Sequence, residues 1–334
     1  MFRRRNEDGA ALLSVLLVLS IMSAVLVGLL RDMNLAVRIT TNAAETERAR
    51  YQAIAAEGLA KSQLRQILER TGGVLNNTGN WNGQTVPVQI DGGLMTLQVS
   101  DHTVCFNENG VVIAADDTER QNDNTRYVTS LALQRQFSRL LEALDIPSTQ
   151  AQRIAAEAAD WIDSDQIASR LGAEDTAYRS ALAGPLPANQ LLRSVSELRA
   201  LKSMTPALFD RIAPYLCALP QAQPAVMNVN LMSATDAPLL AALLEGQLGV
   251  QSARAALFAT PPTGWTDLTQ FWSQPGLADL QLGRSAVSQV GLTSTFFELN
   301  VSVQLGSGRA TQSTLIRAEG DRIETVARSW QNAL

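Results

Sequence analysis

The feature that most constrains this chain is an uncharged apolar segment near its N-terminus. Residues 10–30 carry no charged side chain, and at 1.5 Å per residue they form about 31 Å of helix. The hydrocarbon core of a bilayer is about 30 Å thick, so this segment is long enough to cross a membrane once. Arg3, Arg4 and Arg5 precede it, and basic residues mark the cytoplasmic flank of a span. We therefore expect the residues after Arg31 to lie on the opposite side.

Three interpretations of the apolar segment are open from the residues alone. A cleaved secretory signal peptide has an apolar core of about 7–15 residues and an A-x-A-like site, but this run is longer and no such site follows it. A simple membrane anchor fits the length. The third interpretation is a signal cut on the cytoplasmic side after Gly9, which would leave Ala10 as the first residue of an intact apolar helix.

The next part of the chain, residues 31–70, continues the helical pattern. It contains no proline and one glycine, Gly58. Charged residues surround one apolar face, as in an amphipathic helix that packs one side on a domain. That face comprises Leu35, Ile39, Tyr51, Ala55, Leu59, Ile67 and Leu68. Thr71-Gly72-Gly73 then ends the helix, which would measure about 90 Å from Ala10 at 1.5 Å per residue.

Two groups of alternating residues predict strands on either side of a long central block. Residues 86–90 and 94–99 flank Asp91-Gly92-Gly93, which predicts a hairpin. Three further alternating segments predict antiparallel strands near the C-terminus: residues 293–304, 310–319 and 322–330. We expect all these strands to form one antiparallel sheet packed on the long N-terminal helix, which is an α+β fold.

The central block, residues 116–282, has the character of several short helices separated by Pro, Gly and Ser. Strands return only near Ser294, so we predict a large all-α domain inserted into the sheet domain. The two cysteines, Cys105 and Cys217, match no metal-binding or redox spacing. A disulfide in an oxidising compartment and a pair of buried thiols are both compatible with them.

The most chemically specific residues of the block carry oxygen ligands. Asp160, Asp163 and Asp165 lie where a predicted helix ends, and four more candidates follow them: Glu174, Asp175, Asn189 and Glu197. Calcium takes 6–8 oxygen ligands in flexible geometry, whereas zinc prefers nitrogen and sulfur. The spacing does not match an EF-hand. The alternative is that Asp163 and Asp165 cap helices, that Glu197 begins a capping box and that the others are solvated.

Charge and motifs exclude several classes of function. The formal net charge is −5, and residues 196–256 hold four acidic and four basic residues, whereas phosphate backbones require a basic surface. We therefore expect no nucleic-acid partner. The sequence contains no nucleophile elbow, P-loop, zincin motif or dinucleotide-binding glycine motif, so no enzymatic activity is predicted.

Several of these features together resemble one protein family. Gly9-Ala10 followed at once by a long apolar helix resembles the prepilin-peptidase site of type IV pilins and type II secretion pseudopilins. Such proteins usually carry a glutamate at the fifth mature position, which here is Ser14. The minor pseudopilin K of type II secretion lacks that glutamate. Four further motifs resemble that family. They are D-W-I-D-x-D from Asp160, G-A-E-D-x-x-Y from Gly172, S-V-S-E-L from Ser194 and a degenerate F-N-L-N segment, Phe106-Asn107-Glu108-Asn109.

The resemblance implies a domain plan and a ligand set. The plan is a leader at 1–9, a transmembrane helix at 10–30, a periplasmic stem at 31–70, a pilin-like sheet in two parts at 71–115 and 283–334, and the inserted α-domain with a calcium site at 116–282. The α-domain would contain SAM-like, helix-hairpin-helix-like units at 194–220 and 227–272. The implied calcium ligands, for one or two ions, are Asp160, Asp163, Asp165, Glu174, Asp175, Asn189 and Glu197. Residues 182–187 are shorter and less aromatic than the family's usual loop at the second site.

The function implied by the resemblance is assembly rather than catalysis. A K-like subunit would sit at the tip of the secretion pseudopilus in the inner membrane, start filament assembly and help export folded proteins. Its partners would be the I and J minor pseudopilins, the major pseudopilin, the prepilin peptidase that cuts after Gly9 and methylates Ala10, the inner-membrane platform and the lipid bilayer. The alternatives are a membrane-anchored periplasmic calcium-binding enzyme or adaptor, and a DNA-uptake pilin-like protein.

Overall fold

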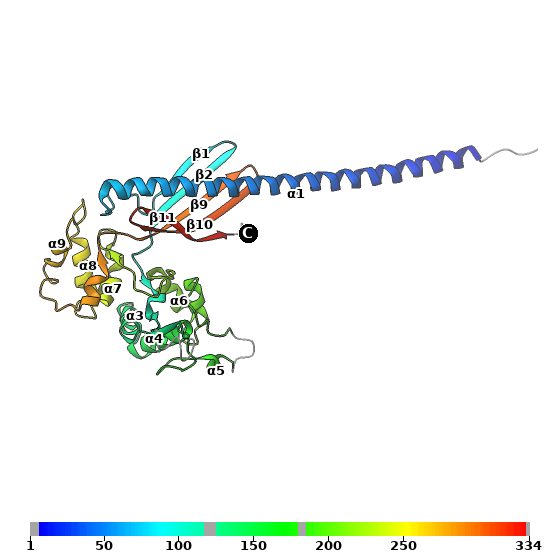
Figure 1. The fold of residues 1–334 in the computed structure, drawn as a ribbon. Helices are drawn as coiled ribbons and strands as arrows, with labels where there is room; N and C mark the ends of the chain where they lie inside the picture. The colour runs from blue at the N-terminus through cyan, green and yellow to red at the C-terminus, as the bar shows by residue number, and fades with distance from the viewer. Residues whose placement is uncertain (1–6, 117–124, 180–184, 332–334) are drawn as a thin grey trace, which may run out of the picture.

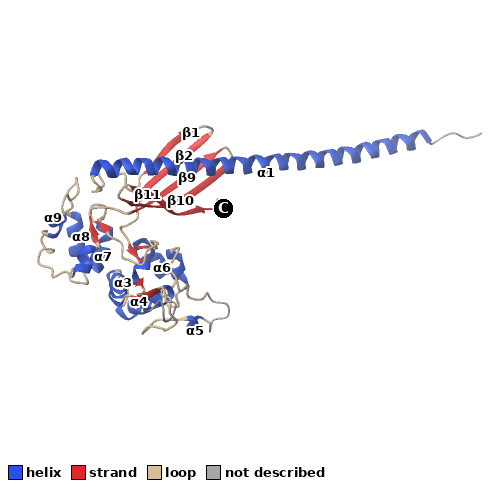
Figure 2. Ribbon diagram, in the orientation of Figure 1, coloured by secondary structure: helices blue, strands red, loops and turns tan. Residues whose placement is uncertain are grey.

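The computed structural model describes residues 7–116, 125–179 and 185–331, with side chains described from residue 11 onward. The first six residues of the predicted leader therefore lie outside the described part, as do residues 182–184 of the predicted second-site loop. The rest of the chain forms a long helix, a sheet beside it and a group of short helices near one end of that helix (Figures 1 and 2).

The helix α1 runs without interruption from Glu7 to Thr71, so its 65 residues span about 97 Å at 1.5 Å per residue. Its N-terminal part projects away from the other elements (Figure 1), and the apolar side chains there, from Leu12 to Ile39, are exposed. Among the described residues, α1 is the one helix long and apolar enough to cross a membrane. It ends as predicted, because Gly73 lies in the left-handed region at φ 84° and its N–H donates to the Leu68 carbonyl at 2.9 Å.

The C-terminal part of α1 packs on a five-stranded antiparallel sheet in the order β1-β2-β9-β10-β11. The strands are β1 (Thr85–Ile90), β2 (Gly93–Asp101), β9 (Phe296–Leu305), β10 (Gly308–Glu319) and β11 (Arg322–Gln331). Ala49, Ala53 and Ala56 are buried at the contact, and such small side chains let helix and sheet approach closely. The predicted α+β class, with a long N-terminal helix on an antiparallel sheet, is confirmed, and so is the hairpin in which Ile90 pairs with Gly93.

Polar contacts also join α1 to the sheet. The side chain of Glu57 is 3% exposed and accepts hydrogen bonds from Arg328 at 3.0 and 3.1 Å, from Lys61 at 3.2 Å and from the Thr325 hydroxyl. Burial raises the pKa of Glu57, but these hydrogen bonds outweigh burial and leave the pKa below its usual value. About three turns nearer the N-terminus of the helix, Glu45 accepts from both the main-chain N–H and the hydroxyl of Ser307, each at 2.7 Å.

The chain between β2 and β9 forms the helical region. Its α-helices are α3 (Leu131–Ala143), α4 (Ser148–Ile162), α5 (Asp175–Tyr178), α6 (Pro206–Ile212), α7 (Ala237–Leu243), α8 (Val250–Phe258), α9 (Leu268–Trp272) and α10 (Arg284–Ser288), and its 3-10 helices are η1 (Glu108–Val111), η2 (Val195–Ala200), η3 (Ala213–Tyr215) and η4 (Ala234–Asp236). The sequence boundaries at 116 and 282 stay predictions.

Short strands interrupt this region, so the prediction that strands return only near Ser294 is wrong. They are β3 (Phe106–Asn107), β4 (Val112–Ala114), β5 (Tyr127–Thr129), β6 (Leu216–Cys217), β7 (Met227–Asn228) and β8 (Val290–Gly291), paired β3–β6, β4–β5 and β7–β8. Each has two or three residues, which is too short for alternation to show in the sequence. They form because segments that are separated in the sequence, such as Phe106 and Leu216, meet side by side in the fold.

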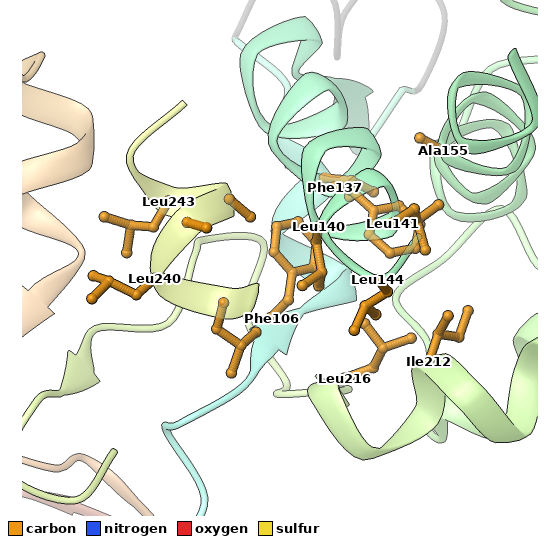
Figure 3. Close-up of a cluster of buried hydrophobic side chains, with 14 of the residues drawn as sticks. Phe106, Phe137, Leu140, Leu141, Leu144, Ala155, Ile212, Leu216, Leu240 and Leu243 are labelled. Atoms are coloured by element: carbon orange, nitrogen blue, oxygen red, sulfur yellow. The ribbon is translucent and has the colours of Figure 1, made fainter. Parts of the chain in front are cut away.

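The core of the helical region is continuous and apolar (Figure 3). Phe106 and Phe137 stack with ring centroids 5.2 Å apart, and leucines from α3 and α7 surround them, among them Leu140 and Leu240. A separate cluster fills the space between α1 and the sheet. The described residues therefore form two principal cores, one for each set of elements, and a smaller cluster around Cys105, Cys217 and Phe296.

A disulfide and a group of polar contacts lie in the helical region close to its junction with the sheet, where Cys105 and Cys217 pack with Phe296 of β9. Cys105 and Cys217 form a disulfide with Cα atoms 5.8 Å apart, which decides the question that the sequence left open. Next to it, the Asn107 amide accepts from the Leu219 N–H at 2.9 Å and donates to the Gln223 carbonyl at 2.7 Å. Asn109 accepts from the Leu192 N–H at 2.7 Å in the same way. The two asparagines thus satisfy main-chain groups that no helix or sheet would pair.

Candidate metal centre

The candidate site lies where α4 ends and the chain turns into a loop. Asp163 is the residue after the helix and has an extended backbone, which turns the chain away from the helix axis. One carboxylate oxygen each of Asp163, Asp165 and Glu174 lie within 4.8 Å of one another. Asp163 and Glu174 are each 3% exposed, so this acidic cluster is largely withdrawn from solvent.

Several of the cluster's oxygens are left without partners. The Thr129 hydroxyl donates to Asp163 Oδ2 at 2.7 Å, but Asp163 Oδ1 has no hydrogen-bond partner within the described ranges. Both carboxylate oxygens of Glu174 are buried and equally unpartnered in the part of the chain that the structure describes. Buried oxygens of this kind are normally hydrogen-bonded, so each such exception requires a compensating group.

A fourth residue places an amide oxygen near the end of the same helix. The N–H of Asn189 donates to the Trp161 carbonyl at 3.1 Å, which puts this residue beside α4, close to Asp163. Its backbone is in the left-handed region, with φ 49°, a conformation that asparagine tolerates better than most residues. Its Oδ1 is buried and lacks a hydrogen-bond partner among the residues described.

The electrostatics of the cluster suit a bound cation. Burial, and then the neighbouring carboxylates Asp165 and Asp160, raise the pKa of Asp163 to about 7. Burial, followed by the charges of Asp163, Asp160 and Asp165, raises the pKa of Glu174 to about 8. Carboxylates held together in this way resist ionisation unless a cation compensates their charge. An all-oxygen donor set of carboxylates and an amide suits a hard divalent cation such as calcium and does not suit zinc.

The loop that carries Asp165 and Glu174 is held against α4 by backbone contacts. The carboxylate of Asp160 accepts from the Ser169 N–H at 3.0 Å, and Asp165 accepts from the Ile167 N–H at 2.7 Å. A Cβ atom on Gly172 would lie 2.0 Å from Asp160 Oδ2, so a larger residue there would push the loop away from the helix. Asp160 thus positions the loop, one helical turn before Asp163.

Two other predicted ligands have local partners instead. Asp175 pairs with Arg179 at 2.8 Å on α5. Glu197 accepts from the N–H groups of Arg193 and Ser194 at 2.7 and 3.1 Å and completes a capping box on η2, as the alternative interpretation of the sequence proposed. The seven-residue ligand set as a whole stays a prediction, and the structure brings together Asp163, Asp165 and Glu174.

Sequence reasoning did not identify Thr129 and Ser164 as parts of the site. Thr129 lies on β5, and Ser164 exchanges hydrogen bonds with Tyr127 on the same strand at 3.0 and 3.1 Å. These contacts join residues more than 30 positions apart, and no spacing rule in the sequence marks them. Gly9 and Ala10, the predicted processing residues, lie in the first turns of α1.

Comparisons with known proteins assign the chain to a family. Two family models described as "Type II secretion system (T2SS), protein K" match residues 104–221 and 227–293. The chain is 31% identical to type II secretion system protein K of Aeromonas hydrophila over 97% of each chain. It is 30% identical to the protein of the same name from Pectobacterium carotovorum subsp. carotovorum over 98% of this chain and 97% of that protein.

A solved structure agrees with the sequence relatives. One chain of the crystal structure of the GspK-GspI-GspJ complex from enterotoxigenic Escherichia coli superposes with a TM-score of 0.73 and 26% identity, covering 88% of this chain and 99% of that one. Because the superposition covers 88% of this chain, it includes the sheet and the helical region as well as the long helix. Sequence and structure thus agree that the chain belongs to the type II secretion system protein K family.

Proposed function

We propose that this chain is the minor pseudopilin at the tip of a type II secretion pseudopilus, where it starts filament assembly and helps to export folded proteins across the outer membrane. It would be a single-pass protein of the inner membrane with the sheet and the helical region in the periplasm. Its contacts in the membrane would come from α1, since exposed apolar helices associate side by side in lipid.

The observation that carries the tip position is the chemistry of residue 14. Pseudopilins usually carry a glutamate there, and in the filament it pairs with the N-terminal amine of the subunit above. In this chain the Ser14 hydroxyl donates to the Ala11 carbonyl of its own helix at 2.8 Å. A carboxylate in the bilayer requires a partner, whereas this hydroxyl is satisfied without one. A subunit with no neighbour above it has no use for the glutamate.

The shape of the molecule supports the same position. The helical region lies near the end of α1 opposite its projecting apolar end (Figure 2). In a filament built from parallel α1 helices, this bulk would cover the periplasmic end and obstruct a further subunit above it. The related GspK was solved together with GspI and GspJ, and we infer that the I and J minor pseudopilins are this chain's direct partners. The major pseudopilin, the prepilin peptidase and the inner-membrane platform would be its other contacts.

We also propose that calcium binds at the acidic cluster. Asp163, Asp165 and Glu174 would hold the ion together with the amide oxygen of Asn189, and water molecules would complete the coordination. The ion would supply positive charge and fix the loop after α4, with no catalytic step. This part of the proposal rests on the unpartnered buried oxygens of the described residues, and it can fail without affecting the tip position.

The first test follows the N-terminus. The full chain is expressed with its secretion system, in strains with and without the prepilin peptidase, and its intact mass is measured. We expect loss of residues 1–9 and a methylated Ala10 only where the peptidase is present. An intact Met1 in both strains would instead favour the membrane-anchored adaptor.

The second test locates the subunit. Isolated pseudopili are labelled with gold-conjugated antibody against the helical region and viewed by electron microscopy. A tip subunit gives label at one end of each filament, and its deletion lowers the number of filaments rather than their mean length. Label distributed along the filament would overturn the tip position.

A further inference from the structure

A second surface of the helical region has the composition of a binding site. Helices α3 and α4 and residues 170–171 enclose a groove with a volume of about 570 Å³, within the range of about 300–1,000 Å³ that is typical of ligand sites. We call it the α3–α4 groove. Buried alanines of α4, Ala155 and Ala156, line it, and their short side chains leave the space open.

The charge of the groove is opposite to that of the whole chain. Arg135, Arg139 and Arg170 line it together with a single carboxylate, Glu142, whereas the chain as a whole has a net charge of −5. Glu142 is already engaged, because it accepts from Arg139 at 2.8 Å and from the Ser148 hydroxyl at 2.7 Å. Arg135 and Arg170 are exposed, and neither forms a salt bridge within the described part of the chain.

Apolar side chains line the groove beside these arginines. Leu131 is 65% exposed and Leu171 is 44% exposed, and Leu171 has a left-handed backbone with φ 75°. A large apolar side chain in that conformation is uncommon and persists only where the surrounding structure enforces it. Gln134 adds an amide to the same lining, and such a group can pair with the main chain of an extended peptide.

We propose that the α3–α4 groove binds an acidic, extended segment of a partner protein, with carboxylates on the arginines and intervening apolar side chains on Leu131 and Leu171. The guanidinium fork matches a carboxylate in a bidentate geometry. The apolar lining favours a peptide over a bare phosphate, which gains nothing from two exposed leucines. The proposal is independent of the tip position, and its test is run at constant calcium because Arg170 and Leu171 lie on the loop after α4.

The test uses the full chain in phosphatidylcholine nanodiscs. The probe is a short fluorescent peptide of alternating leucine and aspartate, blocked at both ends, and its binding is followed by fluorescence anisotropy against empty nanodiscs. We expect saturable binding that weakens as salt increases. The corresponding leucine–lysine peptide should not bind, because its charge has the sign of the groove.

The deciding variant is Arg135→Gln combined with Arg170→Gln. It should weaken binding of the acidic peptide about tenfold or more, because each lost contact is a hydrogen bond between charged groups. The matched control is Arg153→Gln combined with Arg254→Gln, which removes the same charge from exposed residues outside the groove lining and should bind like the parent. Equal thermal unfolding of both variants excludes misfolding as the cause.

Three results would overturn the proposal. The first is unchanged affinity in the Arg135/Arg170 variant, and the second is equal loss in both variants. The third is displacement of the peptide by inorganic phosphate but not by chloride at the same ionic strength. That result would identify a phosphate or lipid-headgroup site instead.

Discussion

Glu108 is the least compensated residue of the described structure. It is 0% exposed, both of its carboxylate oxygens lack a hydrogen-bond partner among the described residues, and burial raises its pKa well above the usual value. Its neighbours Asn107 and Asn109 bind main-chain groups on either side, so Glu108 cannot turn outward without breaking those contacts. In the family's F-N-L-N segment a leucine takes this place.

Replacing Glu108 tests whether its burial without a partner destabilises the protein. We expect Glu108→Leu to stabilise the protein at neutral pH by about 1–3 kcal/mol, the usual cost of burying a polar group without a partner. Because the folded-state pKa is raised, the parent loses stability as the pH rises above about 4.5, and the gain from the variant should grow in the same direction. Thermal unfolding from pH 4 to pH 8 measures it. An equal effect at every pH would show that shape rather than charge is responsible.

Glu57 shows the opposite case, a buried carboxylate with a full set of partners. We expect Glu57→Gln to destabilise the protein by about 2 kcal/mol or more, since it leaves Arg328 and Lys61 without their counter-charge. The folded-state pKa is lowered, so this contribution is present above the usual pKa of about 4.5 and is lost as the pH falls.

The matched control for Glu57 is Glu47→Gln. Glu47 pairs with Arg50 on the solvent side of the same helix, and its side chain is 58% exposed. An exposed pair contributes about 0–1 kcal/mol, so denaturant unfolding should separate the two variants clearly. Similar losses of unfolding free energy in both variants would show that the buried Glu57 contributes no more to stability than the exposed Glu47.

The loop after α4 is the element that the proposed calcium ion would hold. In the parent protein, calcium at about 100 times its dissociation constant should stabilise the fold by about 2.7 kcal/mol, because the ion binds the folded state. The Asp163→Asn/Glu174→Gln variant should lose that increase in the melting temperature.

The control for the ion is Glu197→Gln. Glu197 is the N3 residue of the capping box on η2, a position that glutamine also fills, so this change should alter stability by less than about 1 kcal/mol and leave the calcium response intact. Differential scanning calorimetry with calcium and with a chelator makes both measurements. An unchanged calcium response in the Asp163/Glu174 variant would place the ion elsewhere.

Elements with strong periodicity were predictable from the sequence, and elements defined by distant contacts were not. The continuous helix to Thr71 and the hairpin at Asp91 follow from apolar patterning and turn residues. The two-residue strands such as β6 and the part played by Thr129 depend on segments that meet only after folding. The acidic spacing indicated the region where Asp163, Asp165 and Glu174 lie together, but it could not separate Asp163, which is buried in this cluster, from Glu197, which completes a capping box.

At the scale of the whole molecule, one disulfide lies close to the point where the chain passes from the sheet into the helical region. The disulfide links positions 112 residues apart, and closing a loop of this size restricts the unfolded chain strongly. We expect Cys105→Ser/Cys217→Ser to lower the free energy of unfolding by about 2–5 kcal/mol. It should also expose the segment around Asn107 to limited proteolysis, because the bond holds that segment to Cys217 on β6.

Reducing the disulfide of the parent protein provides an internal comparison for the double variant. The reduced parent and the double variant should unfold at the same temperature. If the double variant is as stable as the oxidised parent, the asparagine contacts alone hold the junction.

The same bond also sets an order of events during synthesis. Cys217 emerges from the ribosome long after Cys105, and disulfides persist only in oxidising compartments. With the helical region in the periplasm, as proposed, closure cannot precede the arrival of Cys217 there, and strands β9, β10 and β11 follow Cys217 in the chain. Formation of the disulfide therefore reports when Cys217 reaches the oxidising compartment. Trapping free thiols at intervals after a radioactive pulse would show whether the bond closes before the last three strands complete the sheet.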